Sequence, residues 1–169
     1  MLTLDLQRLR DEPIDVGAQV PADDPLWEGF DVDLAVPLEV TARAELTSSL
    51  NVWVRGAFEA RLNSACRRCL EPLEVHVVEE FEMLFDPDVE SGDEDFTLYR
   101  LDPKADELDL GTPMRERLLL KLPAFPVCRP ECRGMCAQCG AELNSGDCGC
   151  SRVEMDPRWG PLLELRGTG

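Results

Sequence analysis

Three successive stretches of the chain alternate apolar and polar residues with a period of two. They run over residues 34–46, 50–62 and 73–85. Such alternation is typical of a β-strand that has one face on a hydrophobic core and the other in solvent. Three half-buried strands in succession, joined by short connections, predict an antiparallel meander.

The flanking segments carry weaker signals. Leu2, Leu4 and Leu6 alternate and suggest one further strand near the N-terminus. Residues 11–33 are rich in Pro and Asp and are predicted to form a long connection. Residues 86–109 are acidic and interrupted by Pro and Gly, which indicates a solvated loop with one short strand over its part from Phe96 to Leu101.

Two short helices are predicted after the acidic stretch. Thr112 followed by Pro113 is typical of a helix start, because threonine caps the first turn and proline fits its first position. This helix should extend to about Lys121, and Asp156-Pro157 should start the second. The side of the first helix that we expect to face the sheet consists of Met114, Leu118 and Leu119.

Eight cysteines are the candidate metal ligands of the chain. They are Cys66, Cys69, Cys128, Cys132, Cys136, Cys139, Cys148 and Cys150. Two of the pairs are separated by two residues, a spacing that lets two thiolates on a tight turn bind one tetrahedral ion. In a reducing compartment, metal ligation explains eight cysteines better than disulfides do. The spacing therefore predicts zinc knuckles.

The number of sites is open at this point. The local pairing places Cys136, Cys139, Cys148 and Cys150 around one zinc ion and leaves the other four for a second ion. A single site drawn from both segments, with spare cysteines, is the alternative. A four-cysteine site has no position for water and predicts a structural role. The run from Cys132 to Cys139 also matches the C-x3-C-x2-C pattern of radical iron–sulfur enzymes, but their barrel needs roughly 200 residues.

These features together predict an α+β fold. It is a mostly antiparallel β meander with one or two short helices and a zinc-stapled, cysteine-rich C-terminal segment. We expect residues 1–127 to form a β-rich core domain with an acidic loop at 86–109. Residues 128–169 are expected to form a zinc-binding segment packed on that core.

The formal net charge is −17, from 17 basic and 34 acidic side chains. This argues against a protein that binds nucleic acid with its whole surface, because such binding rests on neutralising phosphates. Residues 79–109 hold thirteen acidic and two basic side chains. By contrast, residues 40–72 hold five basic and three acidic, and residues 112–152 six and four. The cysteine-bearing segments are thus mildly basic within an acidic protein.

A few other residues are candidates for partner contacts. Four arginines flank the cysteines, namely Arg67, Arg68, Arg129 and Arg133. They either offset the thiolate charge or present a small RNA-facing patch. Trp53 lies on the outward phase of its strand and marks either a contact surface or a covered site. His76, the single histidine, is expected at the surface, and no acid–base constellation predicts an enzyme or a small-molecule substrate.

The location of the protein is predicted from two absences in the sequence. The start of the chain has no basic head followed by an apolar run, so no signal peptide is expected. The most apolar stretch, residues 118–127, is interrupted by a lysine and two prolines and is too short for a membrane span. We therefore expect a cytoplasmic protein with no membrane partner.

The combination of motifs resembles the YceD family, the large ribosomal RNA subunit accumulation proteins of bacteria and plastids, in its cysteine-rich branch. The resemblance covers residues 34–165. The residues that carry it are Cys66-Arg-Arg-Cys69-Leu70, Leu120-Lys-Leu-Pro123, Cys128, Cys132-Arg-Gly-Met-Cys136-Ala-Gln-Cys139-Gly140, Leu143-Asn144, Cys148-Gly-Cys150 and Asp156-Pro157-Arg158. The resemblance implies a role in ribosome biogenesis and rRNA accumulation, without catalysis, and a zinc-bearing ribosomal protein as a partner.

We therefore expect a non-enzymatic factor with one or two structural zinc ions that binds ribosomal RNA or a basic large-subunit ribosomal protein. The charge separation suggests that the acidic residues 79–109 hold the basic protein while the arginine-flanked knuckles touch RNA. The alternative is a zinc-handling protein that delivers metal to a client such as a zinc-bearing ribosomal protein.

Overall fold

The chain forms two compact units that do not follow the chain order. Unit 1 comprises Met1–Ala65 and Pro72–Pro126, and unit 2 comprises Cys66–Glu71 and Val127–Gly169. The residues described in this computed structural model are 2–47, 50–89, 97–150 and 158. A six-residue turn between two long strands of unit 1 therefore belongs to the cysteine-rich unit 2. The expected packing of residues 128–169 on the core stays a prediction.

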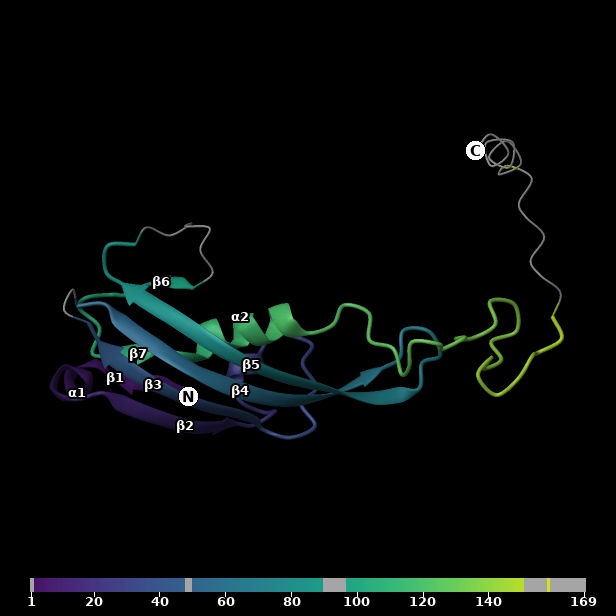
Figure 1. Cartoon of the computed structure of the whole chain (residues 1–169), viewed down its shortest axis with the longest axis horizontal. Coiled ribbons are helices and arrows are strands. Elements are labelled where there is room, and N and C mark those ends of the chain that lie inside the picture. The colour runs from purple at the N-terminus through teal and green to yellow at the C-terminus, as the bar shows by residue number, and fades with distance from the viewer. Residues whose placement is uncertain (1, 48–49, 90–96, 151–157, 159–169) are drawn as a thin grey trace. The chain divides into compact units, whose positions relative to one another are not determined.

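Unit 1 is built on a five-stranded sheet with the strand order β2-β3-β4-β5-β6 (Figure 1). The strands are β2 (Ile14–Val20), β3 (Leu38–Leu46), β4 (Val52–Ala65), β5 (Pro72–Asp86) and β6 (Leu98–Arg100). Strands β2 to β5 pair antiparallel, and β6 pairs parallel with β5. The predicted meander is confirmed, because β3, β4 and β5 lie within or close to the three alternating stretches.

The alternation puts one face of the sheet on the core. Val40 of β3 lies opposite Phe58 of β4, and Val54 lies opposite both Ala44 and Met83, so buried residues form rows across the strands. The buried residues of β4 fall on alternate positions, at Val52, Val54, Phe58, Ala60 and Leu62. The intervening positions carry mostly polar side chains on the opposite, solvent-facing side. This one-sided burial is what the period of two requires.

Shorter elements complete unit 1. They are β1 (Thr3–Asp5), α1 (Leu6–Asp11), the 3-10 helix η1 (Pro25–Trp27), β7 (Glu107–Asp109) and α2 (Gly111–Lys121). Strands β1 and β7 form a separate antiparallel pair, and α2 lies along one face of the large sheet (Figure 1). Met114 and Leu118 of α2 are fully buried, as predicted, whereas Leu119 is only half-buried. No described helix is long and apolar enough to span a bilayer.

The prediction that residues 11–33 form a connection is wrong. Strand β2 pairs along its whole length with β3, from Ile14 opposite Ala44 to Val20 opposite Leu38. The alternation Ile14, Val16, Ala18 and Val20 is present in the sequence, but the neighbouring Pro, Asp and Gly residues obscure it. Cross-strand pairing stabilises this strand where local propensity does not.

The acidic stretch contains more structure than a loop with one strand. The expected strand is present as β6, and β7 adds a second one that pairs with the N-terminal β1. Leu6 does not extend β1, because the Asp5 side chain accepts hydrogen bonds from the backbone N–H groups of Gln7 and Arg8 and starts α1 there. The predicted helix after Asp156, the connection at Ser48-Ser49 and Phe96 lie outside the described residues.

Leu110, not Thr112, is the N-cap residue of helix α2 and makes no side-chain cap, but Asp109 just before it supplies an acceptor for the first turn. The Asp109 carboxylate accepts from the Gly111 N–H at 2.7 Å and from the Thr112 hydroxyl at 2.7 Å. We expect Asp109→Ala to lower the free energy of unfolding by about 1 kcal/mol, because these first-turn groups lose their partner. Urea unfolding measures this value. Glu116→Ala, an exposed change later in the helix, is the control and should shift it by less than about 0.5 kcal/mol. Equal shifts would contradict the capping role.

Candidate metal centres

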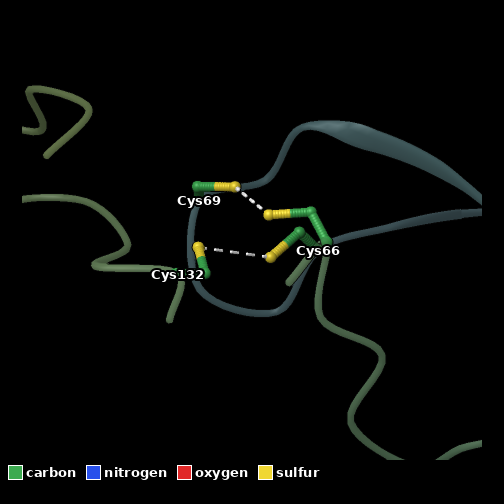
Figure 2. Close-up of side chains that lie close together, drawn as sticks. Cys66, Cys69 and Cys132 are labelled. Carbon is green, nitrogen blue, oxygen red and sulfur yellow. Dashed lines mark hydrogen bonds between the residues drawn. The ribbon is translucent and has the colours of Figure 1, made fainter. Parts of the chain in front are cut away.

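The first cysteine cluster gathers residues from two distant segments of the chain. Its members are Cys66, Cys69, Cys128 and Cys132, whose sulfur atoms all lie within 4.8 Å of one another. The Sγ atoms of Cys66 and Cys132 are 3.8 Å apart, and those of Cys69 and Cys128 are 3.7 Å apart. Figure 2 shows the labelled Cys66, Cys69 and Cys132 side chains directed toward the same space. All but Cys128 are buried.

The local backbone explains how Cys66 and Cys69 come together. Cys66 follows directly on the last residue of β4, and the turn closes when the Leu70 N–H donates to the Cys66 carbonyl at 2.9 Å. The Cys66 N–H donates in turn to the Glu71 carbonyl at 2.9 Å. Leu70 has a positive φ of 62°. The turn is thus a knuckle that directs both sulfurs to one side.

The second cluster repeats this arrangement in the C-terminal segment. Its members are Cys136, Cys139, Cys148 and Cys150, again with all sulfur atoms within 4.8 Å. The Gly140 N–H donates to the Cys136 carbonyl at 2.9 Å, the same closure as in the first knuckle. Cys139 and Cys150 are exposed, and the other two are half-buried. The second cluster is therefore the more accessible one.

Two backbone contacts hold the segment after Cys132 against the first knuckle. The Met135 N–H donates to the Arg68 carbonyl at 3.0 Å. Gly134 has a φ of 73°, and a Cβ atom there would lie 2.8 Å from the Arg68 carbonyl oxygen. A glycine is therefore required at this position. The Arg68 guanidinium adds hydrogen bonds of 3.0 Å to the carbonyls of Pro130 and Cys132.

Asn144, from the loop between the two halves of the second cluster, contacts the first cluster. Its side-chain Nδ2 donates to the Cys132 sulfur at 3.4 Å, and its Oδ1 accepts from the Arg133 N–H at 2.9 Å. The Asn144 amide lowers the pKa of Cys132, because the hydrogen bond favours the thiolate. Asn144 is thus a neighbour of the candidate ligands that is not itself a ligand.

Backbone N–H groups in each cluster favour the thiolate of a knuckle cysteine, Cys66 in the first and Cys136 in the second. Burial opposes ionisation of Cys66, but backbone N–H groups that include those of Cys69 and Arg68 outweigh it and lower the pKa of Cys66 to about 6. In the second cluster, backbone N–H groups of Cys139 and Gln138 lower the pKa of Cys136 to about 6. Such donors prepare a sulfur to bind a cation.

Other members of the clusters are held as thiols by their neighbours. The Glu71 N–H favours the Cys69 thiolate, yet burial and the nearby sulfurs raise the pKa of Cys69 to about 12. Cys139 and Cys148, together with burial, raise the pKa of Cys150 to about 12. Four sulfurs this close repel one another when charged, and a bound divalent cation would relieve this repulsion.

The grouping of the cysteines agrees with the local pairing that the spacing suggested. The structure forms two four-cysteine clusters, and none of the eight cysteines is in a disulfide. Cys132 belongs to the first cluster while Cys136 and Cys139 belong to the second. The C-x3-C-x2-C run of the radical enzymes is therefore divided between two clusters and does not form one site.

The predicted contact residues are dispersed. Arg68 and Arg133 make contacts within unit 2. Arg68 binds backbone carbonyls, and Arg133 forms an ion pair with Asp147. Arg67 and Arg129 are exposed. Trp53 lies in unit 1, half-buried under the Arg55 guanidinium, which is 4.8 Å from its ring centroid.

Sequence reasoning missed the roles of Gly134 and Asn144. Both belong to the motifs that carry the family resemblance, which is the only sequence signal that singles them out. His76, predicted at the surface, is exposed there and contacts the Glu59 carboxylate at 2.8 Å.

A β-sheet unit interrupted by a cysteine-rich unit with two four-cysteine clusters defines a class of candidate metal-binding proteins. The family model described as large ribosomal RNA subunit accumulation protein YceD matches residues 54–166, and the chain belongs to this family.

The chain is 35% identical over 137 residues to an uncharacterized protein of Mycobacterium tuberculosis, a match that covers 80% of this chain and 65% of that relative. It is 39% identical over 64 residues to the chloroplastic large ribosomal RNA subunit accumulation protein YCED homolog 1 of Arabidopsis thaliana, which covers 38% of this chain and 20% of the homolog. No solved structure matches the chain significantly.

Proposed function

We propose that this protein is a non-enzymatic factor, stabilised by two structural zinc ions, that supports accumulation of large-subunit ribosomal RNA. The observation that carries the metal assignment is the composition of the interior of unit 2. The hydrophobic core cluster of the described residues lies entirely in unit 1. In the described part of unit 2, the buried side chains are those of Cys66, Cys69 and Cys132. A bound ion supplies the folding energy that an apolar core does not.

The geometry of the first cluster fits zinc. Four sulfurs at about 2.3 Å from a tetrahedral zinc ion are about 3.8 Å from one another. The sulfur–sulfur distances of 3.8 Å and 3.7 Å in this cluster match that edge. Four soft thiolate ligands favour zinc or an iron–sulfur cluster, and the two knuckle turns are typical of zinc. Four cysteines complete the coordination, which supports a structural rather than a catalytic ion.

The ribosomal role is supported by the family. Its description names accumulation of large-subunit ribosomal RNA, and the chloroplastic relative carries the same description. Two observations favour a basic ribosomal protein as the direct partner. The chain carries a net charge of −17, and the four arginines within residues 66–71 and 127–150 are balanced by four acidic side chains in the same ranges, at Glu71, Glu131, Glu142 and Asp147. Residues 66–71 and 127–150 thus have no excess of cations for phosphates, because the additional basic side chains of the longer segments 40–72 and 112–152 lie outside these ranges.

Binding to a basic large-subunit ribosomal protein tests this proposal. Glu80 and Glu82 lie exposed on the solvent-facing side of β5, within the acidic residues 79–109. We expect Glu80→Gln/Glu82→Gln to weaken binding several-fold at low salt and less at high salt, because the charges act at long range. Glu39→Gln, on the same sheet but outside this stretch, is the control. Unchanged binding of the ribosomal protein would reject docking on the acidic residues. Binding of ribosomal RNA in place of that protein would identify RNA as the partner.

Delivery of zinc to a client protein is the second candidate function. The exposure of Cys139 and Cys150 favours it, because accessible sulfurs permit ligand exchange with another protein. Zinc that a modest chelator removes without loss of structure would support delivery. Zinc whose removal unfolds unit 2 would support the structural role.

A further inference from the structure

We infer that Asn144 couples the two cysteine clusters, so that a metal ion at the second cluster holds in place the side chain that stabilises metal at the first. The inference rests on the metal binding proposed above and adds a positioning residue and an order of metal loss to it. All the contacts that carry it lie within unit 2.

The position of Asn144 in the chain sets up the coupling. It lies between Cys139 and Cys148, in the loop whose two ends are ligands of the second cluster. Its side chain nevertheless engages the first cluster, with Nδ2 3.4 Å from the Cys132 sulfur and Oδ1 2.9 Å from the Arg133 nitrogen. A single amide thus binds two successive residues of the segment that carries Cys132.

The second cluster closes the loop that carries Asn144. Within the loop, the Leu143 N–H donates to the Gly134 carbonyl at 2.8 Å, and Glu142 forms an isolated antiparallel bridge with Met135. The Cys136 N–H also donates to the Ala141 carbonyl at 2.8 Å, and Asp147 forms an ion pair with Arg133. The second cluster adds a restraint where the loop ends meet at Cys139 and Cys148. A metal ion shared by these ligands restrains both ends, and its loss returns conformational entropy to the loop.

The hydrogen bond that Asn144 makes is of the kind that tunes a metal site. N–H donors to ligating atoms orient the ligand, and their removal typically lowers metal affinity by a factor of about 10 to 100. The Arg68 N–H donates to the Cys66 sulfur at 3.4 Å, but it belongs to the same knuckle. Asn144 is the donor that reaches the first cluster from the loop of the second.

The burial of the sulfurs predicts the order in which the two ions are lost. Three cysteines of the first cluster are buried, whereas Cys139 and Cys150 of the second are exposed. A chelator or a client therefore reaches the second ion first. Once that ion has left, the loop releases Asn144, and the first ion loses a stabilising contact.

The test follows metal release from the zinc-loaded full chain in excess chelator. Alkylation of the exposed thiols, located by mass spectrometry, reports which cluster has opened. We expect cysteines of the second cluster to be alkylated first. Asn144→Asp keeps the acceptor for the Arg133 N–H but replaces the donor to Cys132 with a negatively charged oxygen, so it should speed release from the first cluster at least about tenfold. Ser145→Ala, one residue along the loop, removes a hydrogen bond to Glu142 but no donor to a sulfur. It therefore controls for a general loosening of the loop and should speed release from the first cluster by less than about twofold.

A double-mutant comparison isolates the coupling from a general loss of structure. In the Cys139→Ser/Cys150→Ser background, the first cluster should already release its ion faster, and adding Asn144→Asp should then change the rate by less than about twofold. Cobalt(II) gives an independent readout, because its thiolate charge-transfer band at the first cluster should shift in Asn144→Asp and not in Ser145→Ala.

The outcomes separate this inference from the proposed function. Two bound ions with a first-cluster release rate unaffected by Asn144→Asp would overturn the role of Asn144 alone. If Asn144→Asp speeds release from the first cluster by the same factor with and without the second-cluster substitutions, the two effects are independent. That result would overturn the coupling. A chain that binds no zinc or cobalt would overturn the proposed metal binding and this inference together.

Discussion

Replacing Cys66 with serine is expected to remove one of two zinc ions and to unfold the part of unit 2 around the first cluster. Cys66 is fully buried and its sulfur lies 3.8 Å from that of Cys132. A serine hydroxyl stays protonated at neutral pH and is a poor ligand for a soft site. Because binding of a structural zinc ion can be worth about 10 kcal/mol, its loss exceeds what the sparse contacts of unit 2 can offset.

Metal analysis of the purified protein and tryptic mapping measure the two parts of this result. We expect one zinc ion per chain in place of two, and rapid cleavage after Arg67 and Arg68, which lie in the knuckle of the first cluster. Cys139→Ser is the comparison, because it should lose the second ion while keeping these sites protected. Two ions retained in Cys66→Ser, or a tryptic map like that of the native protein, would contradict the structural assignment.

Placing a methyl group at Gly56 is expected to destabilise unit 1 by about 3 kcal/mol. Gly56 lies in the middle of β4, opposite Ala42 of β3 and Phe81 of β5. A Cβ atom there would lie 2.1 Å from the Thr41 carbonyl oxygen and 2.6 Å from the Ala42 Cα atom. These are backbone atoms of the neighbouring strand, so the overlap is relieved only if β3 and β4 move apart.

Gly17→Ala provides a matched control in the same sheet. Gly17 lies in the edge strand β2, and no atom lies within 4 Å of the position of its added Cβ. This substitution should leave stability unchanged or raise it by about 0.5 kcal/mol, because alanine restricts the unfolded chain. Urea unfolding followed by far-ultraviolet circular dichroism compares the two variants. Similar midpoints for Gly56→Ala and the native protein would show that the strands accommodate the methyl group.

The two units obtain their stability in different ways. In unit 1, the fully buried Phe58, Met83, Met114 and Leu118 belong to a hydrophobic core that the sheet and α2 share. In the described part of unit 2, the interior is formed by cysteine side chains. Removal of metal should therefore unfold unit 2 while the sheet of unit 1 persists, and a single unfolding transition for the whole chain is not expected.

Much of the fold follows from local patterns in the sequence. The period of two along β3, β4 and β5 fixes which side chains are buried, because a one-residue shift would turn every apolar side chain to solvent. The helix α2 ends where predicted, at Lys121, since Pro123 follows. The cysteine spacings within each knuckle likewise follow from the geometry of a tight turn.

The remaining features depend on contacts between residues far apart in the sequence. Strand β2 has weak local propensity and forms because β3 offers it a full edge, and β7 pairs with the distant N-terminal strand β1. The interactions of Gly134 with Arg68 and of Asn144 with Cys132 have no local pattern at all. Their physical basis is a close backbone approach and a single hydrogen bond, and neither produces a periodic pattern in the sequence.

The sequence by itself thus determined the meander, the position of α2 and the residue type that makes up both clusters. The tertiary structure alone decided that eight cysteines form two clusters of four rather than one site with spare thiols, because the spacing within each pair does not state which pairs meet. It also decided that the turn from Cys66 to Glu71 belongs to unit 2. The reason is that long-range contacts select among arrangements that local geometry permits equally.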